Sequence, residues 1–242
     1  MRKTVWATAA AAAMSGGVLL GTVGMAGGPA AEAAPSLDPA NFSKPVANPY
    51  FPLTPGLVLR YRGHDDREQD REKVTVTHRT KMIEGVKATV VHDVLRRTDG
   101  SLAEDTRDWY ADDNDGNVWY LGEDTATYKP NGQLDSREGS WQAGVHGAVA
   151  GLIMPAHPKP TDAYRQEFWR GQAEDQAWIV QNNTTMKVVQ GRHRHVVRSY
   201  EWSRLEKANV SVKFYARGLG IIRERDVSGG HEFFQLVSVT RP

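Results

Sequence analysis

Cysteine is absent from this chain of 242 residues. Without a thiol the protein has no disulfide bond, no cysteine nucleophile, no cysteine-ligated zinc site and no cysteine to carry a lipid anchor. Its stability must therefore come from packing. No metal and no other cofactor is expected.

The chain also lacks an excess of charge of either sign. It has 30 Lys and Arg against 29 Asp and Glu, a formal net charge of +1. A nearly neutral protein has no net field to attract nucleic acid or anionic lipid, so neither is an expected partner. The common motifs for serine hydrolases, zinc proteases and phosphate-binding loops are missing as well.

The first 33 residues have the pattern of a signal peptide. Arg2 and Lys3 precede the apolar stretch 4–23, and Ala31-Glu32-Ala33 supplies the small-x-small site that a signal peptidase reads. A retained membrane anchor is the weaker alternative, because Ser15-Gly16-Gly17 interrupts the apolar run. We expect a secreted protein, extracellular or associated with the cell envelope, with no stable membrane insertion after cleavage.

Two regions are expected after the signal peptide. Residues 34–55 carry six prolines, at 35, 39, 45, 49, 52 and 55, which excludes a regular helix or a central strand and predicts an extended arm pinned by Tyr50, Phe51 and Leu53. Residues 56–242 form the second region, a β domain.

The β domain is predicted from side chains that alternate with a period of two residues. Glycine-containing turns such as Glu84-Gly85, Asp99-Gly100 and Asp115-Gly116 separate consecutive runs, as hairpins require. The fold class is therefore mainly β, a single antiparallel curved sheet or half-barrel with a long covering loop. The expected strands are 57–62, 73–80, 86–96, 106–111, 117–121, 177–180, 185–189, 196–202, 210–215, 220–226 and 233–240.

Two segments are expected to lie outside the sheet. Residues 64–73 are mostly charged and are interpreted as a solvated hairpin tip. Residues 139–162 mix glycine and proline with the apolar run 149–154, so we expect a long connection that covers the open side of the sheet.

The densest cluster of aromatic residues lies in 108–124, DWYADDNDGNVWYLGED. A hairpin that turns at 113–116 would place Trp109 opposite Tyr120 and Tyr110 opposite Trp119. A calcium loop is the weaker interpretation, because Ala111 and Gly122 stand where oxygen ligands are needed. The candidate ligand-binding residues are Trp109, Tyr110, Trp119, Tyr120, Trp141 and Met154.

A smaller set of side chains is considered for catalysis or metal binding. Paired carboxylates perform glycoside hydrolysis, and tryptophans at 109, 141, 169 and 178 offer either a sugar-stacking platform or core packing. His193 and His195 share a strand face, but arginines surround them and disfavour a metal. The candidate catalytic residues are Asp108, Glu123, His146, His157, Tyr164 and Glu167.

Four stretches together resemble a family of uncharacterised exported bacterial proteins: NPYFPLTPG, DWYADDNDGNVWYLGED, GLIMPAHP and YARGLGIIRE. The resemblance covers nearly all of the chain after the signal peptide, and it transfers no catalytic residue because the family has no established activity. The first and last stretches also resemble, more loosely, half-barrels of the lipoprotein-carrier kind. That resemblance implies a curved sheet with a cleft.

The expected function is binding without catalysis, with an apolar or amphiphilic small molecule as partner. An extracellular hydrolase or lyase acting on a polymer is the alternative, and a structural surface protein is the third. A cleft in which the candidate carboxylates and histidines converge would favour the enzyme, whereas a wholly apolar cleft would favour the carrier.

Overall fold

The computed structural model describes residues 37–65, 68–206 and 208–242, so the expected signal peptide lies outside the described residues. One 3-10 turn, η1 (Pro39–Phe42), precedes fifteen strands. None of the helical structure in these ranges is long and apolar enough to cross a membrane. The strands are β1 (Val58–Asp65), β2 (Glu68–Ile83), β3 (Val86–Arg97), β4 (Leu102–Asp112), β5 (Val118–Tyr128), β6 (Leu134–Ser136), β7 (Trp141–Gln142), β8 (Val149–Met154), β9 (Ala163–Arg165), β10 (Glu167–Phe168), β11 (Asp175–Val188), β12 (Gly191–Ser203), β13 (Val210–Ala216), β14 (Gly220–Ser228) and β15 (Phe233–Thr240).

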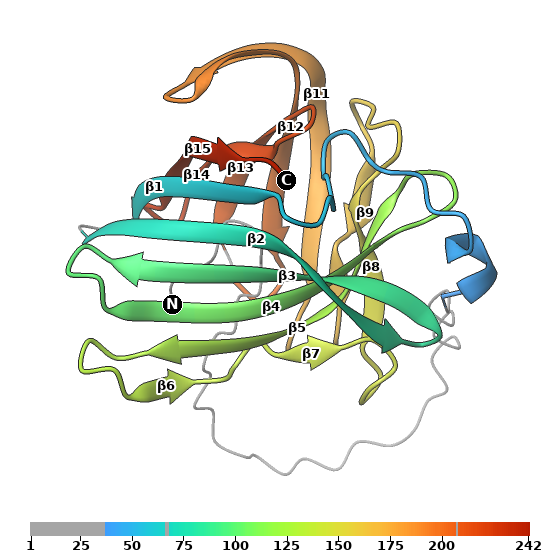
Figure 1. The fold of residues 1–242 in the computed structure, drawn as a ribbon, viewed down its shortest axis with the longest axis horizontal. Helices are drawn as coiled ribbons and strands as arrows, with labels where there is room; N and C mark the ends of the chain where they lie inside the picture. Colours follow the sequence, from blue (N-terminus) through green and yellow to red (C-terminus); the bar gives the residue numbers. More distant parts are fainter. Residues whose placement is uncertain (1–36, 66–67, 207) are drawn as a thin grey trace, which may run out of the picture.

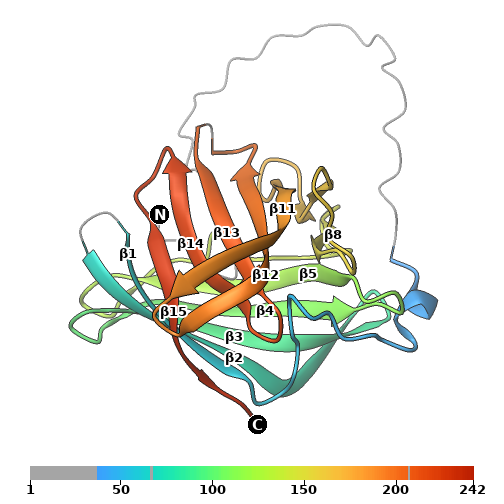
Figure 2. The ribbon, with the colours of Figure 1, turned by 90° about the horizontal axis from the view of Figure 1, so that it is seen from above.

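The strands form one antiparallel sheet that curves into a half-barrel (Figure 1). Its order is β10-β8-β5-β4-β3-β2-β1-β15-β14-β13-β12-β11-β9, so most neighbours in sequence are neighbours in the sheet. Seen from above, β11 to β14 cross β2 to β5 at a steep angle, and β1 and β15 join the two halves (Figure 2). The predicted curved antiparallel sheet is confirmed.

A short segment connects the two edges of the sheet. The strands β9 and β10 flank Gln166, and β9 pairs with β11 while β10 pairs with β8. The backbone of this segment lies close to that of Gly151 in β8, where an added Cβ would be 2.3 Å from the carbonyl carbon of Gln166. Only glycine lets the two backbones come this near, so the sequence of β8 is adapted to the seam.

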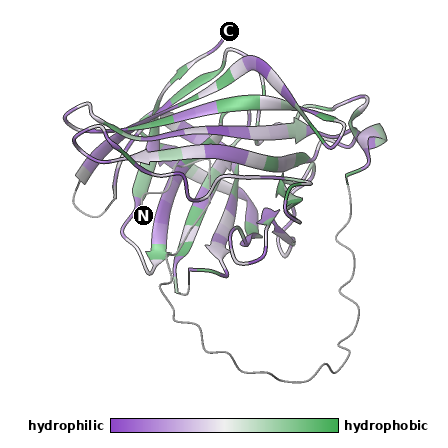
Figure 3. Ribbon diagram, turned by 90° about the horizontal axis from the view of Figure 1, so that it is seen from below, coloured by the Kyte–Doolittle hydropathy of each residue, from purple (hydrophilic) through white to green (hydrophobic). Residues whose placement is uncertain are grey.

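Hydrophobic and hydrophilic residues are interspersed along the strands (Figure 3). The largest side chains that are almost completely buried are those of Tyr61, Tyr110, Tyr120 and Tyr215. The proline-rich arm covers one end of this core, with Tyr50, Phe51 and Leu53 buried. The predicted anchoring of the arm is therefore confirmed.

The predicted covering loop is wrong in part. Residues 149–154 form β8, which pairs with β5 and buries Ile153 and Met154. Trp141 and Gln142 form a further short strand, β7, on β5. The apolar run was too short to distinguish a buried strand from a lid, and it belongs to the core.

Two smaller predictions are also corrected. The charged run 64–73 continues β1 and β2 and buries Asp70 and Glu72, each 2% exposed, so it is more than a hairpin tip. In the aromatic hairpin, Tyr110 lies opposite Tyr120, and Ala111 opposite Trp119, because a bulge shifts the register after Asp108. One extra residue on one strand changes every later cross-strand pair.

Candidate functional site

Four of the predicted site residues meet in one pocket of about 340 Å³, which we call the tryptophan pocket. They are Trp109, Glu123, Trp141 and His146, and a third indole, Trp169, joins them. The pocket thus combines apolar ring surfaces with polar and charged groups. Its remaining lining residues are Lys81, Asp124, Ser140, Gln142 and Val145.

Separate elements bring the three indoles together. Trp109 lies on β4 at the bulge, and Trp141 lies on β7 opposite Glu123 of β5. Trp169 follows β10, and its amide donates to the carbonyl of Ala173 over 2.6 Å. The bulge and the tight turn therefore set where two of the rings lie.

The rim of the pocket carries cations and stacked rings. The Nζ atom of Lys81 lies 3.2 Å from the centroid of the Trp109 ring, a cation–π contact. Partial burial lowers the pKa of Lys81, although the carboxylate of Asp124 opposes this shift. The His146 ring stacks on Trp169 with centroids 6.3 Å apart. His146 is exposed and has a positive φ of 52°, an uncommon backbone conformation for a residue other than glycine.

Two carboxylates lie against the base of the pocket. Glu123 lines it, and Asp108 lies directly opposite Glu123 across β4 and β5. The hydroxyl of Tyr120 donates to Oδ1 of Asp108 over 2.9 Å. Burial raises the pKa of Asp108 to about 7, and burial together with the charges of Asp108 and Glu167 raises the pKa of Glu123 well above its usual value. The carboxyl of Asp108 is therefore partly protonated near neutral pH, and the pKa of Glu123 is shifted in the same direction.

The acidic character extends into the half-barrel. Glu167 on β10 is fully buried, and burial and the nearby Asp175 raise its pKa. Asp93 on β3 is fully buried too, and its pKa is raised chiefly by burial. Within the described ranges, however, no three His, Asp or Glu side chains are arranged so that they could hold a metal ion.

The other predicted ligand-binding residues are packed elsewhere. Tyr110 and Tyr120 are fully buried and stack on each other with centroids 4.7 Å apart. Met154 is fully buried in β8, and Trp119 donates from Nε1 to Asp113 in the hairpin turn over 2.9 Å. These four support the base and the turn and do not line the tryptophan pocket.

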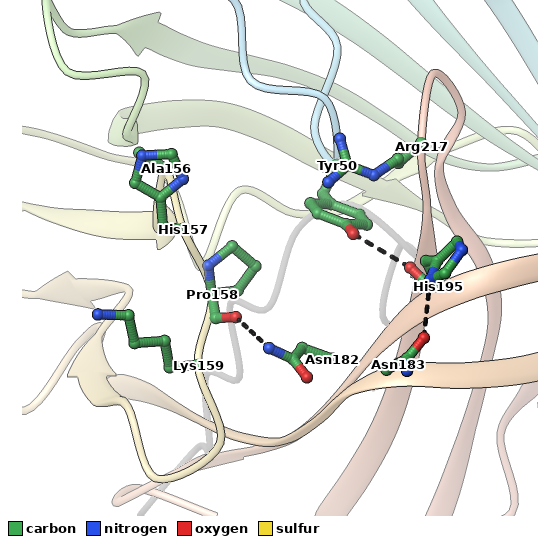
Figure 4. A pocket seen from close by; sticks show the side chains of 9 residues that line it. All are labelled: Tyr50, Ala156, His157, Pro158, Lys159, Asn182, Asn183, His195 and Arg217. Atoms are coloured by element: carbon green, nitrogen blue, oxygen red, sulfur yellow. Dashed lines mark hydrogen bonds between the residues drawn. The ribbon is translucent and has the colours of Figure 1, made fainter.

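The remaining two catalytic candidates lie apart from Glu123. Tyr164 of β9 donates to the carbonyl of Ile153 over 3.4 Å at the seam. His157 lines a second pocket of about 530 Å³, shown in Figure 4, together with Lys159, His195 and Arg217. Among the described residues that line this second pocket there is no carboxylate that could serve as an acidic partner for His157.

The second pocket is held by hydrogen bonds that Figure 4 shows as dashed lines. Tyr50 donates from its hydroxyl to the carbonyl of His195 over 3.1 Å, and Asn182 donates from its amide to the carbonyl of Pro158 over 3.1 Å. The Arg217 guanidinium lies 4.8 Å from the centroid of the Tyr50 ring. The proline-rich arm thus contributes one wall of this pocket.

Sequence reasoning missed the polar part of the tryptophan pocket. Lys81, Ser140 and Gln142 lie in no recognisable motif, and only the long β2 strand and the β7 pairing bring them to the indoles. The tryptophans, in contrast, did indicate the site in the sequence, because three of the four proposed for a stacking platform meet in this pocket. The fourth, Trp178, lies on β11 against Tyr200 and is 43% exposed.

No protein-family model and no curated protein matches the chain. Two solved structures are similar to it at 11% identity, and each match covers 81% of this chain and 100% of the other. One is a protein of Bacteroides fragilis NCTC 9343 with a YmcC-like fold, classed as exported, with a TM-score of 0.48. The other, from Parabacteroides distasonis ATCC 8503, is classed as a lipoprotein and has a TM-score of 0.43. Neither similarity indicates a ligand.

Proposed function

We propose that this is an exported binding protein whose tryptophan pocket takes an amphiphilic ligand with a saccharide ring. The observation that carries the proposal is the convergence of Trp109, Trp141 and Trp169 from three separate elements in one pocket. Scattered core tryptophans need not share a cavity. Three that do so line one cavity with indole surface, and Trp169 exposes more of its ring than Trp109 and Trp141 do.

The polar groups of the pocket support a saccharide over a purely apolar ligand. A sugar ring has a face of C–H groups that packs on an indole and a rim of hydroxyl groups that needs hydrogen-bond partners. Ser140, Gln142 and Asp124 line the pocket beside the indoles and offer both donors and acceptors. Asp124 already accepts a hydrogen bond from Arg137, and Ser140 already bonds to the backbone of Thr125, so a saccharide would use their remaining acceptor sites and the amide of Gln142, which a purely apolar ligand would leave unused.

The pattern of the first 33 residues supports the location. Arg2 and Lys3, the apolar stretch and the Ala31-Glu32-Ala33 site are those of an export signal. A protein delivered outside the membrane meets the saccharides of the cell envelope and the surroundings. Both the compartment and the pocket chemistry therefore agree with glycan binding.

Replacing Trp169 with alanine is expected to weaken saccharide binding by about tenfold or more, which corresponds to about 1.4 kcal/mol. Trp169 is the best residue to change, because Trp109 and Trp141 are only 8% and 4% exposed and also stabilise the core. Calorimetry against chito-, cello- and malto-oligosaccharides measures the loss. The matched control is Trp178→Ala, outside the pocket. If no oligosaccharide binds, or if Trp178→Ala loses as much, the proposal is wrong.

Hydrolysis of a glycan is the second candidate function, and Glu123 favours it. Its carboxyl lines the tryptophan pocket, carries a raised pKa and faces a second carboxyl on Asp108. A protonated carboxylic acid paired with a second carboxylate is what glycosidases use. The two carboxyls, however, offer little accessible surface to a substrate, since Glu123 is 2% exposed and Asp108 is fully buried.

Glu123→Gln separates the two functions. If the protein is a hydrolase, this variant should keep oligosaccharide binding and lose at least a hundredfold in the release of reducing ends, because general acid catalysis contributes about 10²–10⁴-fold. If the protein only binds, the parent chain releases no reducing ends above the level of a heat-denatured sample. Hydrolysis that Glu123→Gln leaves unchanged would exclude this carboxyl as the acid.

A further inference from the structure

A groove of about 810 Å³, separate from the tryptophan pocket, carries a concentration of positive charge. It lies over β1, β2, β3 and β15, and its lining includes the exposed side chains of Arg60, Arg62, Arg71, Lys73 and Arg96. The residues next to them, such as Leu59, Val74 and Leu95, point into the core. The basic side chains therefore share the outer face of the sheet. We call this feature the basic groove.

The hairpin of β11 and β12 gives the basic groove a wall. Figures 1 and 2 show the hairpin bent back over β15, and its tip residue Val189 lines the groove. The guanidinium of Arg223 on β14 donates to the carbonyl of Lys187 over 3.2 Å and so ties the hairpin to the sheet. The surface is consequently a bounded groove and not a flat face.

Like charges lie directly opposite one another in the basic groove. Arg71 is paired in register with Arg62 on one side and Arg96 on the other, and Arg60 is paired with Lys73. Like charges at such positions destabilise a sheet. The chain therefore carries a row of three arginines across three neighbouring strands at a cost to its own stability.

Carboxylates within the described side chains do not neutralise this row. Asp105 lies within 3.1 Å of His92 and 2.6 Å of Arg107, and Glu72 is only 2% exposed. No described carboxylate forms an ion pair with Arg62, Arg71 or Lys73. The balanced net charge of the whole chain thus conceals a local excess of positive charge.

We propose that the basic groove binds a linear polymer that carries phosphate groups. Four of its five cations are arginines, whose planar guanidinium groups bind phosphate oxygens in pairs. Adjacent strands lie about 4.8 Å apart, so Arg62, Arg71 and Arg96 offer closely spaced sites to successive phosphates. A flexible chain can enter beneath the hairpin, whereas a flat membrane surface is kept out by it. This proposal is independent of saccharide binding in the tryptophan pocket.

Linear inorganic polyphosphate is the probe, added to the full chain after export and measured by calorimetry over a range of salt concentrations. We expect polyphosphate to bind. The logarithm of its association constant should fall linearly with the logarithm of the salt concentration, with a slope of about −0.7 for each phosphate contacted. The variant Arg62→Gln/Arg71→Gln/Arg96→Gln should bind at least tenfold more weakly. Its slope should be smaller by about 2, since three contacts are lost.

The matched control is Arg79→Gln/Lys87→Gln/Arg204→Gln, which removes the same charge from exposed positions outside the basic groove. It should keep the affinity within about twofold. Equal losses in both triple variants would mean that polyphosphate responds only to net charge and would overturn the proposal. Binding to vesicles of anionic phospholipid without binding to polyphosphate would overturn the proposal and indicate that the basic groove contacts a membrane.

A second measurement needs no ligand. Arg71→Gln removes the side chain that faces two arginines, so the melting temperature of the free protein should rise. Polyphosphate should raise the melting temperature of the parent chain more than that of Arg71→Gln. A lower melting temperature for the free variant would show that the charge of Arg71 is already compensated, and the proposal would fail.

Discussion

Replacing Lys213 with methionine is expected to destabilise the protein by about 3–5 kcal/mol at neutral pH. Lys213 on β13 is 2% exposed, and its Nζ lies 3.3 Å from Glu201 and 3.6 Å from Glu224. The variant removes the cation and leaves two buried carboxylates facing each other. A buried charge that loses its partner is among the largest costs that a single substitution can cause.

The surroundings of Glu201 explain why its ion pair with Lys213 is stable in the interior. Its carboxylate accepts hydrogen bonds from Tyr215, Ser199 and Gln166 over 2.6, 2.7 and 3.1 Å. Burial alone would raise the pKa of Glu201, but Lys213 and these donors hold it below its usual value. Burial alone would likewise lower the pKa of Lys213, and the two carboxylates raise it instead. Lys213 and the three donors therefore keep the buried carboxylate of Glu201 ionised.

Urea unfolding of Lys213→Met measures the loss. Lys87→Met, on the exposed side of β3, is the control and should change stability by no more than about 0.5 kcal/mol. Adding Glu201→Gln to Lys213→Met should recover part of the stability, because one of the two buried carboxylate charges near position 213 is then removed. A loss below about 1 kcal/mol at pH 7 would contradict the prediction and show that water reaches the site.

The curved antiparallel sheet could be predicted because its main signals are local. Alternating side chains specify strands, and turns such as Glu84-Gly85 specify hairpins between neighbours in sequence. Where the fold depends on contacts between distant segments, the prediction failed. The apolar run 149–154 reads equally as a lid or as a strand, and only its pairing with β5 and β10 decides.

Buried charge was the second source of error. Lys213, Glu201 and Asp70 have nothing in their local sequence that distinguishes them from exposed charges on a strand, yet each is at most 2% exposed. Their burial depends on partners from other strands that curvature brings into the interior. The candidate site was likewise predictable only in part. The indoles stood out by residue type, whereas Lys81 and Gln142 reach the pocket only through the fold.

The pH dependence of stability is expected to change when Asp108 is replaced with asparagine. Burial raises the pKa of Asp108 to about 7, so the folded protein binds this proton more tightly than the unfolded chain does. The associated stability is fully present below the unfolded pKa, near 4, and is lost as the pH rises through about 7. The parent chain should thus lose on the order of 3 kcal/mol from this group between pH 4 and pH 8.

Asp108→Asn tests this directly, because the amide has nearly the same shape, stays neutral and can still accept the hydrogen bond from Tyr120. The difference in unfolding free energy between variant and parent should grow from near zero at pH 4.5 toward about 3 kcal/mol at pH 8, in favour of the variant. Asp115→Asn, on the exposed hairpin turn, should show no such growth. Parallel pH profiles for Asp108→Asn and the parent would mean that folding does not raise the pKa of Asp108, so its carboxyl is ionised at neutral pH. Asp108 would then be the ionised carboxylate that a glycosidase pairs with a general acid, here Glu123, and hydrolysis, the second candidate function, would gain support.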